Sequence, residues 1–329
     1  MTDTVLVTGG TGFVAGWAII ELLRRGYRVR TTVRNVAREG ELRRAIATEV
    51  DPRDRLELAV ADLTHDAGWP QAMAGCRFVL HIASPLAGLE GDALIATAVE
   101  GTRRVLEAAV GAGVERVVMT SSTAACTPAK PLPRAIDEFD WTDPEQPGLA
   151  AYRRSKAMAE RAAWDFIAGK ATVLTTLLPG AIFGPALTPD QGGSVGIIRG
   201  LLHGRPPLLP RLAFNITDVR DLAAMHVKAM ITPEAAGECF IVMGDVLWFG
   251  EVAQVLRDRL GNRAARVPRL LLPDWSARAL AKVSPQMREL LPLLGRTQRF
   301  SSEKAKRILD FTPRPPADTV ADCGASLSV

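Results

Sequence analysis

Residues 4–15 read TVLVTGGTGFVA and open the regular part of the chain. The run Thr4–Thr8 is apolar and contains β-branched residues, which predicts a buried strand. A glycine-rich turn, Gly9–Gly12, follows, and helical periodicity then extends from Phe13 to Arg25. Ala15 stands where a third glycine is often found and is small enough for close helix–strand packing. Strand, turn and helix in this order predict a dinucleotide-binding fingerprint, with the pyrophosphate at the helix N-terminus.

The next predicted strand, Arg28–Val33, carries the signal for the choice of cofactor. It ends at Arg34, about 20 residues past the glycines, where an acid normally binds the ribose 2′-hydroxyl of NAD. An arginine suits the 2′-phosphate of NADP, and Arg38 follows one helical turn later, with no acid before Glu39. The alternative interpretation is a solvated, basic start of a helix.

Strands and helices continue to alternate after this point. Further strands are predicted at Arg55–Ala61, Arg77–Ile82, Glu115–Thr120 and Val173–Leu178, with a long helix at Asp92–Ala112. This pattern predicts an α/β fold with a Rossmann-type, doubly wound parallel sheet, which binds ligands at the carboxyl ends of its strands. Polar residues follow four of these strands, namely Arg34, Asp62, Ser84 and Ser122.

Beyond Pro179-Gly180 the alternation fades. We therefore expect residues 1–180 to form an NADP-binding domain that also carries the catalytic residues. Residues 181–329 are expected to form a smaller, mostly helical substrate-binding region, with some segments returning to the first domain.

A second short motif, Tyr152-x-x-x-Lys156, lies in a run predicted to be helical from Ala151 to Phe166. Residues four apart share one helix face. A nearby ammonium favours the ionised form of a phenol, which suits a group that protonates a carbonyl oxygen. Taken alone, the pair is better explained as incidental, because short motifs often match by chance; the rest of the chain reverses this and favours the functional interpretation.

Composition narrows the class of protein. The chain has 329 residues, 47% of them hydrophobic, and a net charge of +4 without a basic stripe, so no nucleic-acid partner is expected. Its four cysteines are far apart and no histidine cluster is present, so no metal site is predicted. His81 lies in an apolar strand and is interpreted as a hydrogen-bonded core residue. No signal peptide or apolar run of membrane-spanning length is visible, so a soluble, cytoplasmic location is expected.

Several motifs occur in order at the spacing of a known family. They are TGGTGFVA at residues 8–15, HIASP at 81–85, TSS at 120–122 and Tyr152-x-x-x-Lys156, with DEFDW at 137–141 in support. On these residues the chain resembles the extended short-chain dehydrogenase/reductases. Within them it is similar to the branch of dihydroflavonol 4-reductase, cinnamoyl-CoA reductase and the yeast-type methylglyoxal/aldehyde reductases.

The resemblance implies specific roles. Tyr152 would donate a proton to the carbonyl oxygen, Lys156 would favour the ionised phenol and hold the nicotinamide ribose, and Ser122 would hydrogen-bond the substrate oxygen. The cofactor contacts that the resemblance and the motifs imply are Gly9, Thr11, Gly12, Phe13, Val14, Arg34, Arg38, Asp62, Leu63, Ala83, Ser84, Pro85, Tyr152, Lys156, Pro179 and Ile182.

These observations predict an NADPH-dependent oxidoreductase that interconverts C=O and CH–OH groups: a carbonyl, or aldehyde, reductase and alcohol dehydrogenase. Its expected partner is a small-molecule carbonyl substrate, and the chain would be a monomer or homodimer with no membrane contact. Two alternatives stay open. One is an NAD(P)-dependent sugar-nucleotide epimerase or dehydratase on the same fold; the other is a nucleotide-sensing regulatory protein without turnover.

Overall fold

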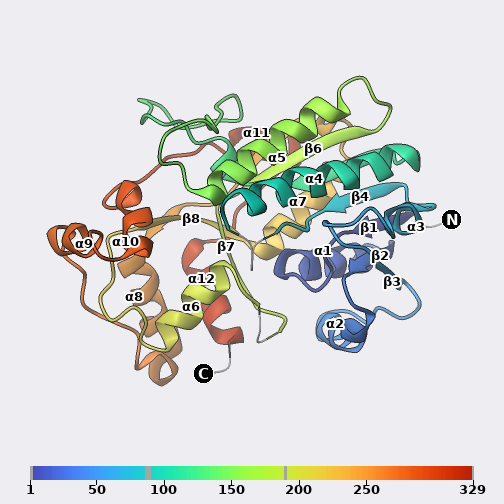
Figure 1. The fold of residues 1–329 in the computed structure, drawn as a ribbon. Helices are drawn as coiled ribbons and strands as arrows, with labels where there is room; N and C mark the ends of the chain where they lie inside the picture. Colours follow the sequence, from blue (N-terminus) through green and yellow to red (C-terminus); the bar gives the residue numbers. More distant parts are fainter. Residues whose placement is uncertain (1–2, 86–89, 189–190, 328–329) are drawn as a thin grey trace. The chain divides into compact units, whose positions relative to one another are not determined.

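The computed structural model describes residues 3–85, 90–188 and 191–327. The chain forms two compact units, which are treated separately below (Figure 1). The first contains residues 1–179, 220–242 and 300–311, and the second contains residues 180–219, 243–299 and 312–329. Among the described residues, no helix is both long and apolar enough to cross a membrane.

The first unit is built on a seven-stranded sheet with the order β3-β2-β1-β4-β5-β6-β9. Every neighbouring pair is parallel, so all the carboxyl ends open at one edge. The chain returns from β3 to β4, so the strand order reverses between β1 and β4. The predicted doubly wound α/β fold is confirmed. Its strands are β1 (Thr4–Val7), β2 (Arg28–Val33), β3 (Leu56–Val60), β4 (Phe78–His81), β5 (Arg116–Thr120), β6 (Val173–Pro179) and β9 (Cys239–Val242).

Helices connect these strands. The α-helices are α1 (Phe13–Arg24), α2 (Glu39–Ala47), α3 (Trp69–Met73), α4 (Gly91–Gly111), α5 (Ala151–Ile167), α7 (Val219–Ile231) and α11 (Glu303–Leu309). Three short 3₁₀ helices are η1 (Val36–Arg38), η2 (Thr123–Ala125) and η3 (Pro233–Ala235).

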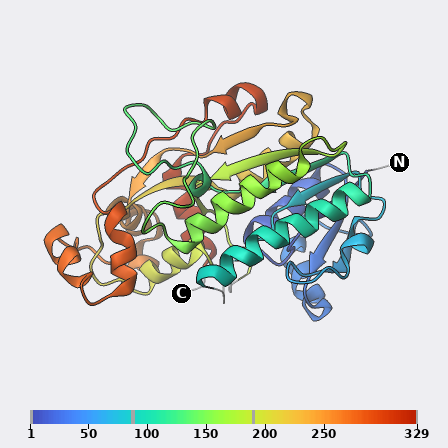
Figure 2. The same cartoon turned by 45° about the horizontal axis from the view of Figure 1, so that its top comes forward.

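Alternation along β5 shows how the two faces of the sheet are covered. Val117 and Met119 belong to a buried cluster that includes residues of α4 and α5. Arg116 and Thr120 point the other way, because they hydrogen-bond to residues of α7 and the segment that follows it. Figures 1 and 2 show α4 and α5 side by side on one face. The α5 face that carries Tyr152 and Lys156 is therefore attached to a packed scaffold.

The second unit contains the helical carboxyl-terminal part that was predicted, together with a small sheet that was not. The sheet has the order β10-β8-β7, in which β7 and β8 are parallel and β8 and β10 antiparallel. Phe214 of β8 lies edge-on to Phe183 and Phe249, with ring centroids 6.1 and 5.4 Å away. The elements are β7 (Ala181–Phe183), β8 (Ala213–Asp218), β10 (Val246–Trp248), α6 (Ser194–Leu202), α8 (Phe249–Leu260), η4 (Gly261–Ala264), α9 (Asp274–Leu280), α10 (Pro285–Leu290), η5 (Leu291–Leu293) and α12 (Pro316–Ser326).

Candidate functional site

The glycine turn after β1 is held in a form that side chains would not permit. Gly9 has φ +74°, and a Cβ on it would lie 3.0 Å from the Cβ of Ala83. A Cβ on Gly10 would lie only 2.3 Å from the hydroxyl of Thr31. The Gly9 N–H donates to the hydroxyl of Thr32 at 2.9 Å, which fastens the turn to β2. These close approaches explain why glycines stand at the first two positions of the turn.

The N-terminus of α1 is open for an anion. Gly12 precedes the helix, no side chain caps it, and the first turn contains no acid. A Cβ on Gly12 would meet only the carbonyl oxygen of Gly9, at 3.1 Å. Thr11, Phe13 and Val14 are partly accessible. Backbone N–H groups at such a terminus carry partial positive charge, so the turn fits a pyrophosphate.

Thr8 and His81 join the ends of β1 and β4 beside this turn. The Thr8 hydroxyl accepts hydrogen bonds from the N–H groups of Ile82 and Ala83, at 3.0 and 2.9 Å. Its own proton therefore points to Nδ1 of His81, 3.1 Å away, which leaves the ring proton on Nε2. Burial, followed by the charge of Lys156, lowers the pKa of His81 to about 3. The interpretation of His81 as a hydrogen-bonded core histidine is confirmed, and its ring is neutral.

The two arginines proposed to bind a 2′-phosphate differ in their surroundings. Arg34 directly follows β2 and is exposed. Arg38, in η1, is also exposed but forms a two-pronged ion pair with Glu41, with Nε–Oε2 and Nη2–Oε1 distances of 2.9 and 2.8 Å. Any phosphate that binds Arg38 must share it with this carboxylate. The charge of Arg34 contributes to the lowered pKa of Asp62.

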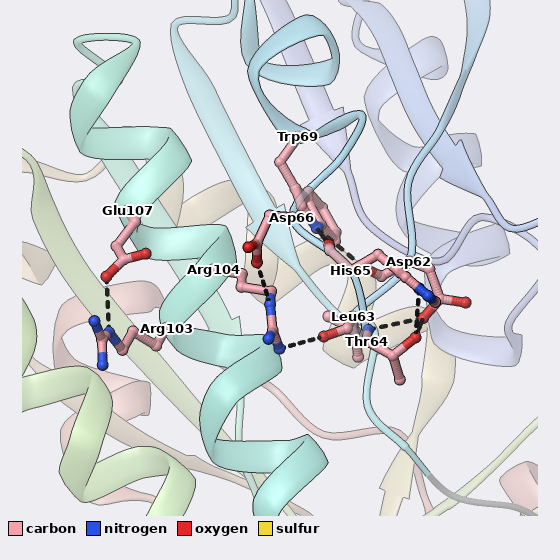
Figure 3. Close-up of polar contacts among 9 residues, drawn as sticks. All are labelled: Asp62, Leu63, Thr64, His65, Asp66, Trp69, Arg103, Arg104 and Glu107. Atoms are coloured by element: carbon pink, nitrogen blue, oxygen red, sulfur yellow. Dashed lines mark hydrogen bonds and ion pairs between the residues drawn. The ribbon is translucent and has the colours of Figure 1, made fainter.

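The loop after β3 carries Asp62 and Leu63 and is held by hydrogen bonds within itself and from α4 (Figure 3). One carboxylate oxygen of Asp62 accepts from the N–H and the hydroxyl of Thr64, both at 2.8 Å. Burial raises the pKa of Asp62, but these hydrogen bonds and the charges of Arg34 and His65 outweigh it and lower the pKa below its usual value. Arg104 of α4 donates to the carbonyl oxygen of Leu63 at 3.0 Å. Asp62 is therefore an ionised, fixed acceptor at the strand end.

Trp69 and the ion pair of Arg104 with Asp66 also hold this loop (Figure 3). The indole N–H of Trp69 lies within hydrogen-bond distance of the carbonyl oxygens of Asp62 and His65, at 3.1 and 3.0 Å. Arg104 also binds the carboxylate of Asp66, and Arg103 binds Glu107 one turn along α4. The loop is thus anchored to both α3 and α4.

Tyr152 and Lys156 occupy the first turns of α5, as predicted. Tyr152 is 39% exposed, whereas Lys156 is only 7% exposed. The Lys156 ammonium donates to the hydroxyl of Ser84 at 3.1 Å. It thereby links α5 to the segment after β4 that also contains Ala83 and Pro85. An accessible phenol and a sheltered ammonium one helical turn apart can act on a single bound molecule.

Ser122 lies at the end of β5, where its hydroxyl accepts from the N–H of Ala124 at 3.1 Å. This leaves its proton available for another acceptor. The next residue, Thr123, donates from its hydroxyl to the carbonyl oxygen of Pro179 at 3.3 Å. The ends of β5 and β6 are therefore joined. Ile182 lies on β7 of the second unit, where it pairs with Thr217.

Two residues absent from the predicted site support it. Thr8 and Glu160 are buried, and each connects segments that carry site residues. Glu160 follows Lys156 by one helical turn, and a glutamate on the apolar face of an amphipathic helix was the available signal. Among the described residues, no group of three or more His, Cys, Asp or Glu side chains could hold a metal ion.

A fold of this kind, with a glycine turn at the switch point and polar residues at the strand ends, defines a Rossmann-type dinucleotide-binding protein. The model of the NAD dependent epimerase/dehydratase family matches residues 5–242. The chain belongs to this family, the extended short-chain dehydrogenase/reductases, so the predicted resemblance is confirmed.

Relatives of the chain are named as reductases. It is 33% identical to cinnamoyl-CoA reductase 1 of Oryza sativa subsp. japonica over 315 residues, which cover 94% of this chain and 86% of the relative. It is also 33% identical to an anthocyanidin reductase of Vitis vinifera over 253 residues, with 71% and 74% of the two chains covered. Among solved structures, Gre2 of Candida albicans in complex with NADPH is similar, with a TM-score of 0.80, 25% identity and 97% of each chain covered.

Proposed function

We propose that this protein is an NADPH-dependent carbonyl reductase that converts aldehydes or ketones to alcohols. Three lines support the proposal: the family, the reductase relatives, and a site whose residues can bind a dinucleotide and protonate an oxygen. The observation that carries it is the Lys156–Ser84 hydrogen bond of 3.1 Å. This bond places the buried ammonium of α5 at the carboxyl-terminal edge of the sheet, where the glycine turn also lies, while Tyr152 stays accessible.

The cofactor is NADP(H), as in the related Gre2 complex. The uncapped N-terminus of α1 would hold the pyrophosphate through the backbone at Gly9, Thr11, Gly12, Phe13 and Val14. Other contacts are assigned by position in the family: Arg34 and Arg38 to the 2′-phosphate, Asp62 and Leu63 to the adenine, Ala83, Ser84 and Pro85 to a ribose, and Pro179 and Ile182 to the nicotinamide.

Bound NADPH supplies the hydride, and the protein supplies orientation and a proton. Ser122 donates a hydrogen bond to the carbonyl oxygen and holds it beside the phenol. Tyr152 transfers its hydroxyl proton to that oxygen as negative charge develops on it. Lys156 favours the phenolate that remains, because its ammonium lies one turn along the same helix. The trio Ser122, Tyr152 and Lys156 thus accounts for the protein's part in the reaction.

Residues 1–180 would bind the cofactor and carry the trio. Residues 181–329, apart from the segments that return to the first unit, would contribute contacts to the substrate. The relatives are named for cinnamoyl-CoA and anthocyanidin, both with aromatic groups. We therefore assign small or aromatic aldehydes and ketones as the substrate class.

Epimerisation or dehydration, after which the family is named, is the competing activity, and its substrate on this fold would be a sugar nucleotide. An arginine rather than an acid after β2 favours NADPH, which is consumed, over a retained NAD. The test is a spectrophotometric screen of NADPH oxidation with aldehydes, diketones, keto esters and aryl ketones. Steady oxidation supports the proposal. Turnover of a nucleotide sugar without net cofactor oxidation, or cofactor binding with no turnover, would contradict it.

A further inference from the structure

Glu160 is a buried acid that the proposed mechanism does not use. It lies on α5 one turn beyond Lys156 and is 1% exposed. One of its carboxylate oxygens accepts a short hydrogen bond from the hydroxyl of Ser121. The other accepts from the hydroxyl of Thr176 at 2.7 Å and from the indole N–H of Trp164 at 3.4 Å. The thiol of Cys239 lies 3.8 Å from the same oxygen. A single side chain of α5 therefore contacts the residue that follows β5 and residues of β6 and β9.

An acid in this position is costly to bury, so its presence calls for an explanation. Burial raises the pKa of Glu160, although hydrogen bonds from Ser121, Thr176, Trp164 and Cys239 oppose the rise. Well-packed apolar residues often replace buried polar groups without loss of stability, whereas removal of one partner leaves the others unsatisfied. What a carboxylate adds over an apolar side chain is directional contact.

Directional contact matters here because the proposed catalytic residues come from two separate segments. Ser121 immediately precedes Ser122 at the end of β5, and Glu160 shares its helix face with Lys156 and Tyr152. Beside Glu160, α5 packs against the apolar cluster through the small residues Ala159 and Ala163, while its larger members Trp164, Phe166 and Ile167 lie at the far end of the helix from Tyr152. Apolar contacts between small side chains fix distance but resist sliding weakly, since they have no preferred direction.

We propose that Glu160 is a positioning residue, which fixes α5 against the end of β5 and so holds Tyr152 and Lys156 in reach of Ser122. This inference rests on the proposed function. Its consequence is that loss of the Glu160 hydrogen bonds lowers kcat even in a protein whose stability has been restored.

The test compares three variants with wild type. Glu160→Gln keeps an acceptor for Thr176 and gains an amide that donates to Ser121, so it should retain most of the kcat. Glu160→Leu alone leaves buried hydroxyls unpaired and should lower Tm. The triple variant Glu160→Leu/Ser121→Ala/Thr176→Val removes those hydroxyls and should recover Tm. Its kcat should nevertheless stay about 10- to 100-fold low, the scale expected when reacting groups are misplaced by about 1 Å.

Thr175→Val is the matched control, because Thr175 is a buried neighbour on β6 that donates to the carbonyl oxygen of Ala235 at 2.6 Å. It should lower Tm without lowering kcat. The Kd for NADPH, measured by fluorescence titration, should change little in every variant. Amide hydrogen exchange of the unliganded triple variant should be faster at residues 121–124 and in the first turns of α5 than in wild type.

The outcomes separate this inference from the proposed function. A triple variant with recovered Tm, wild-type kcat and wild-type exchange overturns the positioning role, as does a Thr175→Val variant that loses kcat equally. Wild-type turnover that survives Tyr152→Phe overturns the proposed mechanism instead. If the wild type reduces no carbonyl, the exchange comparison still decides whether Glu160 fixes α5 to β5.

Discussion

The Lys156 ammonium donates to the Ser84 hydroxyl at 3.1 Å, across 72 positions of sequence. The pair places a charged group, almost fully buried, between the helix with Tyr152 and the segment after β4. A hydrogen bond to a charged group is worth about 1.5–3 kcal/mol. Ser84 is therefore more than a neighbour of the cofactor site: it orients the lysine on which the proposed chemistry depends.

Replacement of Tyr152 by phenylalanine tests the proton donor. The variant loses one hydroxyl from a ring that still packs, so the Kd for NADPH should stay close to that of wild type. Turnover should fall by about 10²- to 10⁴-fold, the usual contribution of a positioned general acid. Steady-state rates with a carbonyl found in the screen, together with a fluorescence titration of NADPH, provide the measurement. Near-normal turnover would rule out Tyr152 as the donor.

Two glycines of the same turn should respond differently to alanine. Gly10→Ala places a Cβ 2.3 Å from the buried hydroxyl of Thr31, which itself donates to the carbonyl oxygen of Val7 at 2.8 Å. Overpacking of this kind costs about 1–3 kcal/mol, so Tm should fall. Gly12 has φ −79°, which alanine adopts, and its Cβ would meet only one backbone oxygen.

Gly12→Ala should consequently fold with a Tm near that of wild type but bind NADPH at least about 10-fold more weakly, a loss of about 1.4 kcal/mol. The reason is that its methyl group would occupy the open end of α1. Thermal unfolding and cofactor titration of both variants check the contrast. Unchanged NADPH affinity in Gly12→Ala would mean that the pyrophosphate lies elsewhere.

The buried histidines predict how stability depends on pH. His226 carries its proton on Nδ1, which donates to the carbonyl oxygen of Leu222 at 2.8 Å, and its Nε2 accepts from the hydroxyl of Thr120 at 2.7 Å. Burial lowers its pKa to about 4, from an ordinary value of 6.5. As the pH decreases below about 6.5, His226 is protonated in the unfolded chain but stays neutral in the folded chain. The free energy of unfolding therefore decreases as the pH is lowered from about 6.5 to about 4.

The size of this effect is about 1.4 kcal/mol per pH unit for each histidine that is protonated only when unfolded. His226→Gln cannot titrate, so its free energy of unfolding should fall less steeply with decreasing pH than that of wild type. Urea unfolding at a series of pH values gives both slopes. Equal slopes would show that His226 is protonated alike in both states.

Catalysis should need no metal ion. The proposed acid is a phenol, and among residues 3–85, 90–188 and 191–327 no cluster of ligand side chains could hold one. Full turnover after exhaustive chelation is the expected result. A loss of turnover that added zinc restores would contradict the mechanism.

Local features made the main sheet predictable from the sequence. The strands β1 and β2 and the helices α1, α4 and α5 were predicted within one or two residues, because short apolar runs, glycines and helical periodicity mark them. The small sheet of the second unit was missed. Its outer strands β7 and β10 have three residues each, too few for a visible alternation, and their pairing joins distant parts of the chain.

Long-range contacts set the limit on prediction of the site. The Tyr152–Lys156 spacing is a property of one helix and could be read from the sequence. The partner of Lys156 could not, because Ser84 reaches it only through the order of the strands. Likewise, the place of Glu160 on the apolar face of its helix indicates burial but not its partners, since Ser121, Thr176 and Cys239 lie in or directly after three strands that are neighbours only in the folded sheet.

Arg34 should determine the preference for NADPH over NADH. It directly follows β2 and is exposed, and its charge lowers the pKa of Asp62, which follows the neighbouring strand β3. A guanidinium is permanently charged and grips phosphate through paired N–H groups. Loss of one such contact, at about 1.5–3 kcal/mol, should weaken NADPH by about 10- to 100-fold. NADH has no 2′-phosphate, so Arg34→Ala should leave its kcat/KM almost unchanged.

Arg38 provides the matched control, because its guanidinium is already paired with Glu41 at 2.8 and 2.9 Å. A phosphate there gains less than at a free arginine, so Arg38→Ala should lower the NADPH/NADH ratio of kcat/KM less than Arg34→Ala does. Glu41→Gln, which weakens the ion pair, should raise the ratio. The double arginine variant should show the largest loss. A ratio that stays constant through all four variants would mean that another residue binds the 2′-phosphate, and a wild-type preference for NADH would mean that the end of β2 binds a ribose hydroxyl instead.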